Sequence, residues 1–113
     1  MVKLMHSIQS NHIAKINRLQ SYQSQIAYWE KSGKNYKRGL QTFQDFMDFL
    51  TEFRDPKALV NGYIRMAKYC EKMEDISLSH DLYKTAMQLM KEFGLGDASH
   101  VKNLELKIRS LNY

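Results

Sequence analysis

Apolar residues recur every three or four positions along almost the whole chain, which is the spacing of amphipathic helices. No segment alternates apolar and polar residues as a half-buried strand does. Only one Pro and five Gly occur among the 113 residues, so few positions are available for the turns of a β fold. The sequence therefore predicts an all-α fold of five to six antiparallel helices.

Helix-breaking and capping residues divide this pattern at four places. The segment Ser32–Asn35 ends the first helix, with Gly33 in the position that follows a helix C-terminus. Asp55 is a good N-cap residue and the Pro after it suits the first helical turn. Glu74 and Asp75 form a short turn, and Gly94–Asp97 combines a C-cap with an N-cap. We expect a single helical domain over residues 1–113 with helices at 1–31, 36–54, 57–73, 76–93 and 97–112.

The length and composition are those of one globular domain, with 43% hydrophobic and 26% charged residues. The single Cys70 has no intramolecular disulfide partner, and its place on an apolar stripe predicts a reduced, buried and unreactive thiol. The N-terminus lacks the apolar run of a signal peptide, and no stretch approaches the roughly 18 apolar residues of a membrane span. These features predict a cytoplasmic protein that makes no use of a membrane.

The segment Tyr63–Met87 reads as two helices joined by a tight turn. Met66, Ala67 and Cys70 on the first helix face Ser79, Tyr83 and Ala86 on the second. Small residues on both sides allow two helix backbones to approach closely, and the tyrosines fill the flanks. The helices of this segment should therefore form a close antiparallel pair.

The order of large, small and aromatic residues in this pair resembles the tetratricopeptide repeat. Tyr63 stands at the first large position, Met66-Ala67 stands for Leu-Gly and Cys70 for Tyr, while Ser79, Tyr83 and Ala86 stand for the Ala, aromatic and Ala positions. The spacing fits without a gap, although several residue identities depart from the pattern.

A looser second copy lies upstream, where Ile26-Ala27, Tyr36, Gly39 and Phe43 follow the same order. Phe46 departs from this copy because a small residue is expected there. The positions of Val101, Leu104 and Ile108 are similar to the first helix of a third, truncated copy, so the resemblance covers residues from about 20 to 112. The resemblance implies stacked helical hairpins; a helical bundle packed through the same residues is the alternative.

Members of this family bind peptides or protein segments on the concave face made by the first helices of the hairpins. Asn side chains can pair with a peptide backbone, and Arg and Lys can hold carboxylates, so such a face would suit an acidic or carboxylate-bearing peptide. An ordinary solvated helix face is the alternative. The resemblance implies a partner-binding set in which Arg65 and Lys68 are central: Gln25, Tyr28, Asn61, Arg65, Lys68, Lys102 and Asn103.

A basic cluster offers a different function. The net charge is +5, and the densest group of cations surrounds Tyr36 in the segment KSGKNYKR. Such a cluster can contact the phosphates of RNA or DNA. The alternative prediction is a small nucleic-acid-binding regulator that uses Lys31, Lys34, Lys37 and Arg38.

The first helix offers a third possibility, a self-associating structural subunit. Its apolar side includes Met5, Ile8, Ile16, Leu19 and Ile26, and the polar His12 within it would weaken or register a dimer.

Catalytic and metal chemistry find little support in the sequence. The four histidines are dispersed, with no i, i+4 pair, so we expect no metal site and no cofactor. No combination of acid, base and nucleophile is visible. The sequence therefore predicts a non-enzymatic helical module that binds a protein or peptide partner.

Overall fold

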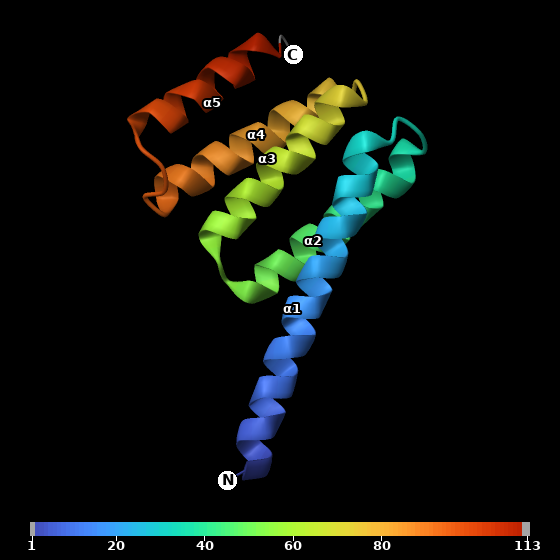
Figure 1. The fold of residues 1–113 in the computed structure, drawn as a ribbon. Helices are drawn as coiled ribbons and strands as arrows, with labels where there is room; N and C mark the ends of the chain where they lie inside the picture. The colour runs from blue at the N-terminus through green and yellow to red at the C-terminus, as the bar shows by residue number, and fades with distance from the viewer. Residues whose placement is uncertain (1, 112–113) are drawn as a thin grey trace. The chain divides into compact units, whose positions relative to one another are not determined.

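The chain is all-α, as the sequence predicts. A computed structural model describes residues 2–111, with side chains from residue 13 onward, and this part of the chain contains five helices and no strand. Figure 1 shows them in order: α1 (Val2–Lys31), α2 (Tyr36–Phe53), α3 (Pro56–Lys72), α4 (Ile76–Glu92) and α5 (Ala98–Ser110).

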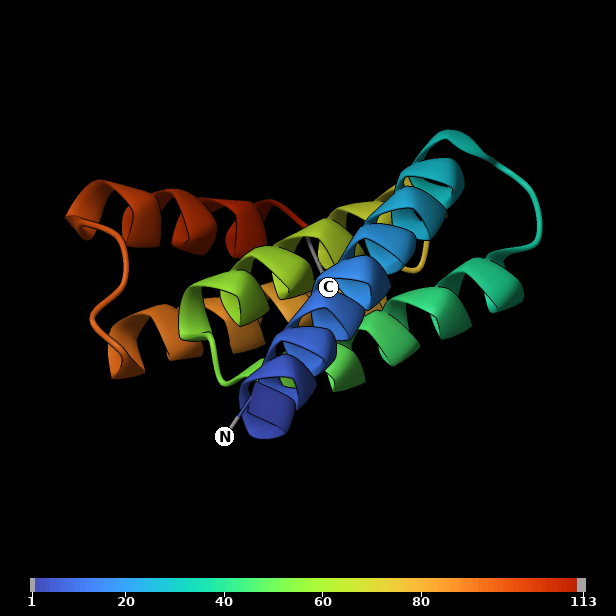
Figure 2. The same cartoon turned by 60° about the horizontal axis from the view of Figure 1, so that its bottom comes forward.

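The chain divides into two units, residues 1–34 and residues 35–113. The first unit contains α1, which runs through positions 10 and 11 as one helix without a break. The second contains α2 to α5. In this unit successive helices run in opposite directions, and each packs chiefly against its neighbour in sequence, as Figures 1 and 2 show.

The contact between α3 and α4 is the most extensive in the second unit. Ala67, Cys70, Ser79 and Ala86 are completely buried in it. The hydroxyl of Ser79 donates a 2.8 Å hydrogen bond to the backbone carbonyl of Ala67 on the facing helix. The small residues of both helices therefore meet along one seam, which we call the α3–α4 seam.

Aspartate begins three of the helices. The carboxylates of Asp55, Asp75 and Asp97 accept hydrogen bonds from the backbone amides three residues further on, at 3.3, 3.4 and 3.0 Å. Each bond satisfies one of the amides that a helix N-terminus leaves without an intrahelical partner. Asp75 also accepts a 2.5 Å hydrogen bond from the hydroxyl of Tyr36, which ties the start of α2 to the turn between α3 and α4.

The end of the first helix differs in detail from the sequence expectation. Gly33 was expected to supply the left-handed residue after the helix, but its φ is not positive. Asn35 adopts that conformation instead, with φ 59°, immediately before α2. Asn tolerates the left-handed region better than most residues because its short polar side chain can hydrogen-bond locally.

The α3–α4 turn and the end of α4 share one backbone arrangement. At the end of α4, Gly94 has φ 64°, and the amide of Leu95 bonds to the carbonyl of Met90 at 2.8 Å. At the end of α3, Glu74 has φ 66°, and the amide of Asp75 bonds to the carbonyl of Cys70 at 2.8 Å. Both are Schellman-type C-caps, but the one after α3 places a side chain where glycine is preferred.

Glu74→Gly should therefore stabilise the protein. The left-handed conformation costs an L-residue with a Cβ about 1–2 kcal/mol, part of which glycine's greater freedom in the unfolded chain offsets. We expect the free energy of unfolding in urea to rise by about 0.5–1 kcal/mol. Gly94→Ala is the matched control and should lower it; a loss of stability in Glu74→Gly would contradict this account of the turn.

Gly39 lies inside α2 because the ring of Tyr69 occupies the space of a side chain. A Cβ at Gly39 would collide with the Tyr69 hydroxyl and lie 2.8 Å from its Cζ atom. The ring has little room to move, since it is buried and packs against Phe43 with ring centroids 5.0 Å apart. The Tyr69 hydroxyl is also buried without a hydrogen-bond partner among the described residues, and burial raises its pKa.

Two substitutions test this packing together. Gly39→Ala should lower the free energy of unfolding by about 1–3 kcal/mol, the usual cost of overpacking, even though alanine favours helices. Tyr69→Phe should be neutral or stabilising, because it removes a buried hydroxyl that lacks a partner.

The double variant Gly39→Ala/Tyr69→Phe should recover part of the loss, because the atom in closest conflict is then absent. Urea unfolding of the four proteins measures the coupling between the two sites. Strictly additive effects would show that the Tyr69 hydroxyl is not what requires glycine at position 39.

Candidate partner-binding surface

Three of the predicted partner-binding residues share one face of α3. Asn61, Arg65 and Lys68 are spaced four and three positions apart, which aligns them along the helix. Asn61 and Lys68 are exposed, whereas Arg65 is half-buried and has an interaction of its own within the structure. Asn61 and Lys68 are thus the α3 members most accessible to a partner.

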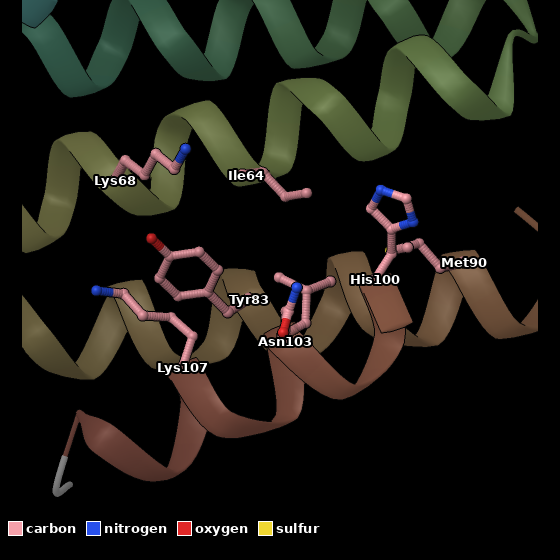
Figure 3. Close-up of a pocket in the computed structure, with 8 residues that line it drawn as sticks. Ile64, Lys68, Tyr83, Met90, His100, Asn103 and Lys107 are labelled. Atoms are coloured by element: carbon pink, nitrogen blue, oxygen red, sulfur yellow. The ribbon is translucent and has the colours of Figure 1, made fainter. Parts of the chain in front are cut away.

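A pocket of about 250 Å³ opens between α3, α4 and α5 (Figure 3). Its apolar wall consists of Ile64 from α3, Met90 from α4 and Leu104 from α5. Ile64 and Leu104 pack against a buried cluster that includes Met90 and Val60, so this wall is continuous with the core of the second unit.

The polar groups gather at one end of this pocket. Figure 3 shows the side-chain ends of Lys68, Tyr83 and Lys107 together there, with Met90 and His100 toward the other end. Asn103 lies between the two ends. The pocket therefore combines an apolar wall with one basic, hydrogen-bonding end.

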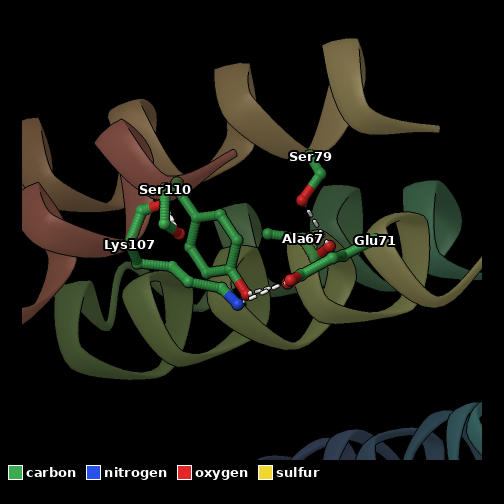
Figure 4. A network of polar contacts seen from close by, with 6 residues as sticks. Ala67, Glu71, Ser79, Lys107 and Ser110 are labelled. Carbon is green, nitrogen blue, oxygen red and sulfur yellow. Dashed lines mark hydrogen bonds and ion pairs between the residues drawn. The ribbon is translucent and has the colours of Figure 1, made fainter. Parts of the chain in front are cut away.

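Glu71 contacts two of the three polar side chains at the basic end of the pocket, Tyr83 and Lys107. Its carboxylate accepts a 3.1 Å hydrogen bond from the hydroxyl of Tyr83 and forms a 2.5 Å ion pair with the ammonium group of Lys107 (Figure 4). One side chain of α3 thus joins both α4 and α5. Burial, followed by the charge of Glu71 and this hydrogen bond, raises the pKa of Tyr83, so its hydroxyl remains a proton donor.

The two lysines of the pocket differ in their electrostatic state. Lys107 is paired with Glu71, and this pairing compensates its charge. No hydrogen bond or ion pair joins the exposed ammonium group of Lys68 to any residue that the structure describes. Lys68 therefore presents an uncompensated positive charge beside an apolar wall.

The other predicted residues lie outside this pocket. Lys102 is exposed on α5 but does not line it. Gln25 and Tyr28 belong to the unit of residues 1–34, where Gln25 donates a 3.1 Å hydrogen bond to Ser21 and Tyr28 is 62% exposed. Of the seven predicted residues, the pocket brings together Lys68 and Asn103.

Sequence reasoning missed the pocket contributions of His100 and Lys107 and the role of Glu71. His100, Asn103 and Lys107 are spaced three and four positions apart and so share one face of α5. This periodicity was available in the sequence, but the assignment of Lys102 and Asn103 followed the family resemblance. No spacing rule connects Glu71 with Lys107, which are 36 residues apart.

The start of α5 forms one rim of the pocket. The carboxylate of Asp97 accepts a 3.0 Å hydrogen bond from the backbone amide of His100. The same carboxylate oxygen lies within hydrogen-bond distance, 2.8 Å, of the Nδ1 atom of the His100 ring. These hydrogen bonds lower the pKa of Asp97. The stabilising effect of this cap is complete above the ordinary pKa of the carboxyl group and is lost as the pH falls through its lowered value.

The residues of the nucleic-acid alternative fall in both units. Lys31 and Lys34 line a depression of about 430 Å³ together with Tyr28 and Gly33. Lys37 and Arg38 are exposed in the first turn of α2, within the second unit.

The residues expected to form a self-association surface lie on α1. Met5, Ile8 and His12 fall outside the side chains that the structure describes. Of the expected residues with described side chains, Ile16 is 39% exposed and Leu19 is half-buried, whereas Ile26 is completely buried and so is not part of an exposed surface.

Cys70 has the surroundings of a structural thiol. It is completely buried, its pKa is raised by that burial, and its sulfur lies 3.4 Å from the hydroxyl oxygen of Tyr36. Within the described residues, no group of three or more His, Cys, Asp or Glu side chains could hold a metal ion. No helix in that part of the chain is long and apolar enough to cross a bilayer.

Comparison with known proteins does not assign the chain to a family. No family model, no curated protein and no solved structure matches it. The site is therefore defined by its own geometry.

Glu71→Gln tests whether this carboxylate holds α5 in place. The variant keeps the size of the side chain and a hydrogen-bond acceptor for Tyr83, but removes the charge that pairs with Lys107. We expect the free energy of unfolding to fall by about 1 kcal/mol, the scale of a partly exposed ion pair. Amide hydrogen exchange should accelerate, relative to the unaltered protein, more in α5 than in α3 or α4.

Glu105→Gln is the matched control, since it removes the more exposed pair with Lys91, in which the nitrogen and oxygen lie 3.4 Å apart. Its effect on exchange in α5 should be smaller. Equal effects of the two variants would mean that Glu71 has no special part in holding α5.

Proposed function

We propose that this chain is a non-enzymatic helical module that binds a peptide or a segment of a partner protein on its α3/α5 face. The observation that carries the proposal is the ammonium group of Lys68, which has no partner among the described residues, in a pocket that Asn103 also lines and that has an apolar wall. The wall can receive an apolar side chain, the amide can pair with a peptide backbone, and the ammonium group can hold a carboxylate.

The surroundings of the pocket support the same proposal. Asn61 and Lys102 add an exposed amide and an exposed ammonium group on α3 and α5. A positively charged rim around an apolar centre favours encounters with acidic segments. The antiparallel packing of α2 to α5 on their neighbours is compatible with both the tetratricopeptide-like hairpins and the helical bundle expected from the sequence, and a reducing compartment such as the cytoplasm suits the lone buried thiol.

A peptide-display selection followed by fluorescence titration tests this function. Lys68→Glu and Lys102→Glu should each lower the affinity for the selected acidic peptides about fivefold or more. Each substitution replaces an attraction of about 1 kcal/mol with a repulsion. Lys84→Glu, an exposed lysine on α4 away from the pocket, should have little effect. Arg65→Glu, expected from the sequence to abolish binding without a change in Tm, replaces a half-buried side chain that interacts within the structure, so we expect it to lower the Tm as well.

Each other outcome has a definite meaning. An unchanged Tm in Arg65→Glu would show that the interaction of Arg65 within the structure adds little stability. Failure to select any peptide would contradict the proposal. The nucleic-acid alternative would be established instead if the protein binds labelled RNA or DNA, if this binding weakens steeply with salt, and if reversing the charges of Lys31 and Lys34 abolishes it. A mass that rises with concentration would favour self-association.

A further inference from the structure

We infer that the pocket between α3, α4 and α5 is also a binding site for a small amphipathic carboxylate, an apolar body with a single acid group. The inference concerns a small molecule and stands whether or not a peptide binds to the surrounding face.

The charged residues at the basic end of the pocket determine the sign of the charge that a ligand should carry. At the basic end of the pocket, Lys107 is paired with Glu71, whereas no residue that the structure describes pairs with Lys68. One carboxylate would match that unpaired charge, and the hydrogen bonds it can accept suit the ammonium group. A cationic head group would instead add to the charge already there.

The walls determine the remainder of the ligand. From the basic end the pocket continues past Ile64 and Asn103 toward Met90 and His100 (Figure 3). Of its lining side chains, Ile64, Leu104 and Met90 offer no strong hydrogen-bonding group. Methionine adapts its shape to a ligand more readily than a branched side chain does. A volume of about 250 Å³ is below the usual range for drug-sized ligands, about 300–1,000 Å³, so the apolar body must be small.

The placement of the pocket gives binding a structural consequence. α5 has no fully buried residue among those described, so it is the helix of the second unit that is least anchored in the core. Yet α5 supplies His100, Asn103, Leu104 and Lys107 to the pocket. A ligand that contacts α3, α4 and α5 at once should therefore hold α5 against the other two helices.

Straight-chain carboxylates from hexanoate to dodecanoate are suitable probes, used below their micellar concentrations. We expect saturable 1:1 binding in calorimetry, with an optimum at intermediate chain length because the pocket is small. Octanol and octylammonium should bind at least about fivefold more weakly than octanoate, the factor that corresponds to one partly exposed ion pair. Octanoate should slow hydrogen exchange in α5 more than in α2.

Variants of Lys68 give the sharpest test, because this exposed side chain can be changed without disturbing the core. Lys68→Gln should lower the affinity for octanoate about fivefold or more. Lys68→Glu should reverse the preference, so that octylammonium binds more tightly than octanoate. Lys84→Gln is the matched control and should bind octanoate as the unaltered protein does.

Three results would overturn the inference: no saturable binding by any probe, affinity that rises steadily with chain length as in unspecific partition, or octanoate affinity that is the same in Lys68→Gln. Peptides that bind in the selection described above while all carboxylates fail would separate the two proposals, leaving the peptide function and removing this site.

Discussion

The close approach of α3 and α4 is the constraint on which the rest of the second unit depends. Ala67 and Ala86 have no side-chain atoms beyond Cβ, and the hydroxyl of Ser79 bonds directly to the facing backbone. These residues bury little apolar area themselves. Their effect is to bring the helices close enough for larger neighbours, such as Tyr83 and Met66, to be buried alongside.

The seam also positions the functional groups. Because the two helices are held close, the hydroxyl of Tyr83 on α4 reaches the carboxylate of Glu71 on α3. That carboxylate is then fixed where Lys107 of α5 can pair with it. A polar contact chain thus begins at the buried seam and ends at the open pocket, and each step limits the freedom of the next side chain.

Stability is distributed unevenly along this chain of contacts. The seam is fully buried, whereas α5 is attached by partly buried apolar side chains such as Leu104 and by ion pairs that retain access to solvent. Local opening should therefore begin at α5, the helix that supplies half of the pocket lining. Any ligand of this pocket would therefore be coupled to the docking of α5, since the lining residues are brought together only when α5 is in place.

Local sequence signals predicted the fold well, because the signals themselves act locally. Asp55, Asp75 and Asp97 cap the helices that follow them through bonds that span three residues. The small residues of the seam were equally visible, since Ala67 and Ser79 are only 12 residues apart, on helices joined by one short turn. Gly33 was misjudged because two residues of this short segment, Gly33 and Asn35, can both adopt the left-handed conformation, and the structure places Asn35 there.

The candidate site was less predictable because it depends on charge pairing between distant positions. The net charge of +5 indicates only that cations are in excess, and it does not show which of them the fold neutralises. Lys68 and Lys107 count equally toward this net charge, but Glu71 pairs with Lys107 and not with Lys68. A paired lysine must lose an existing contact before it can bind a ligand, whereas Lys68 has no such contact among the described residues.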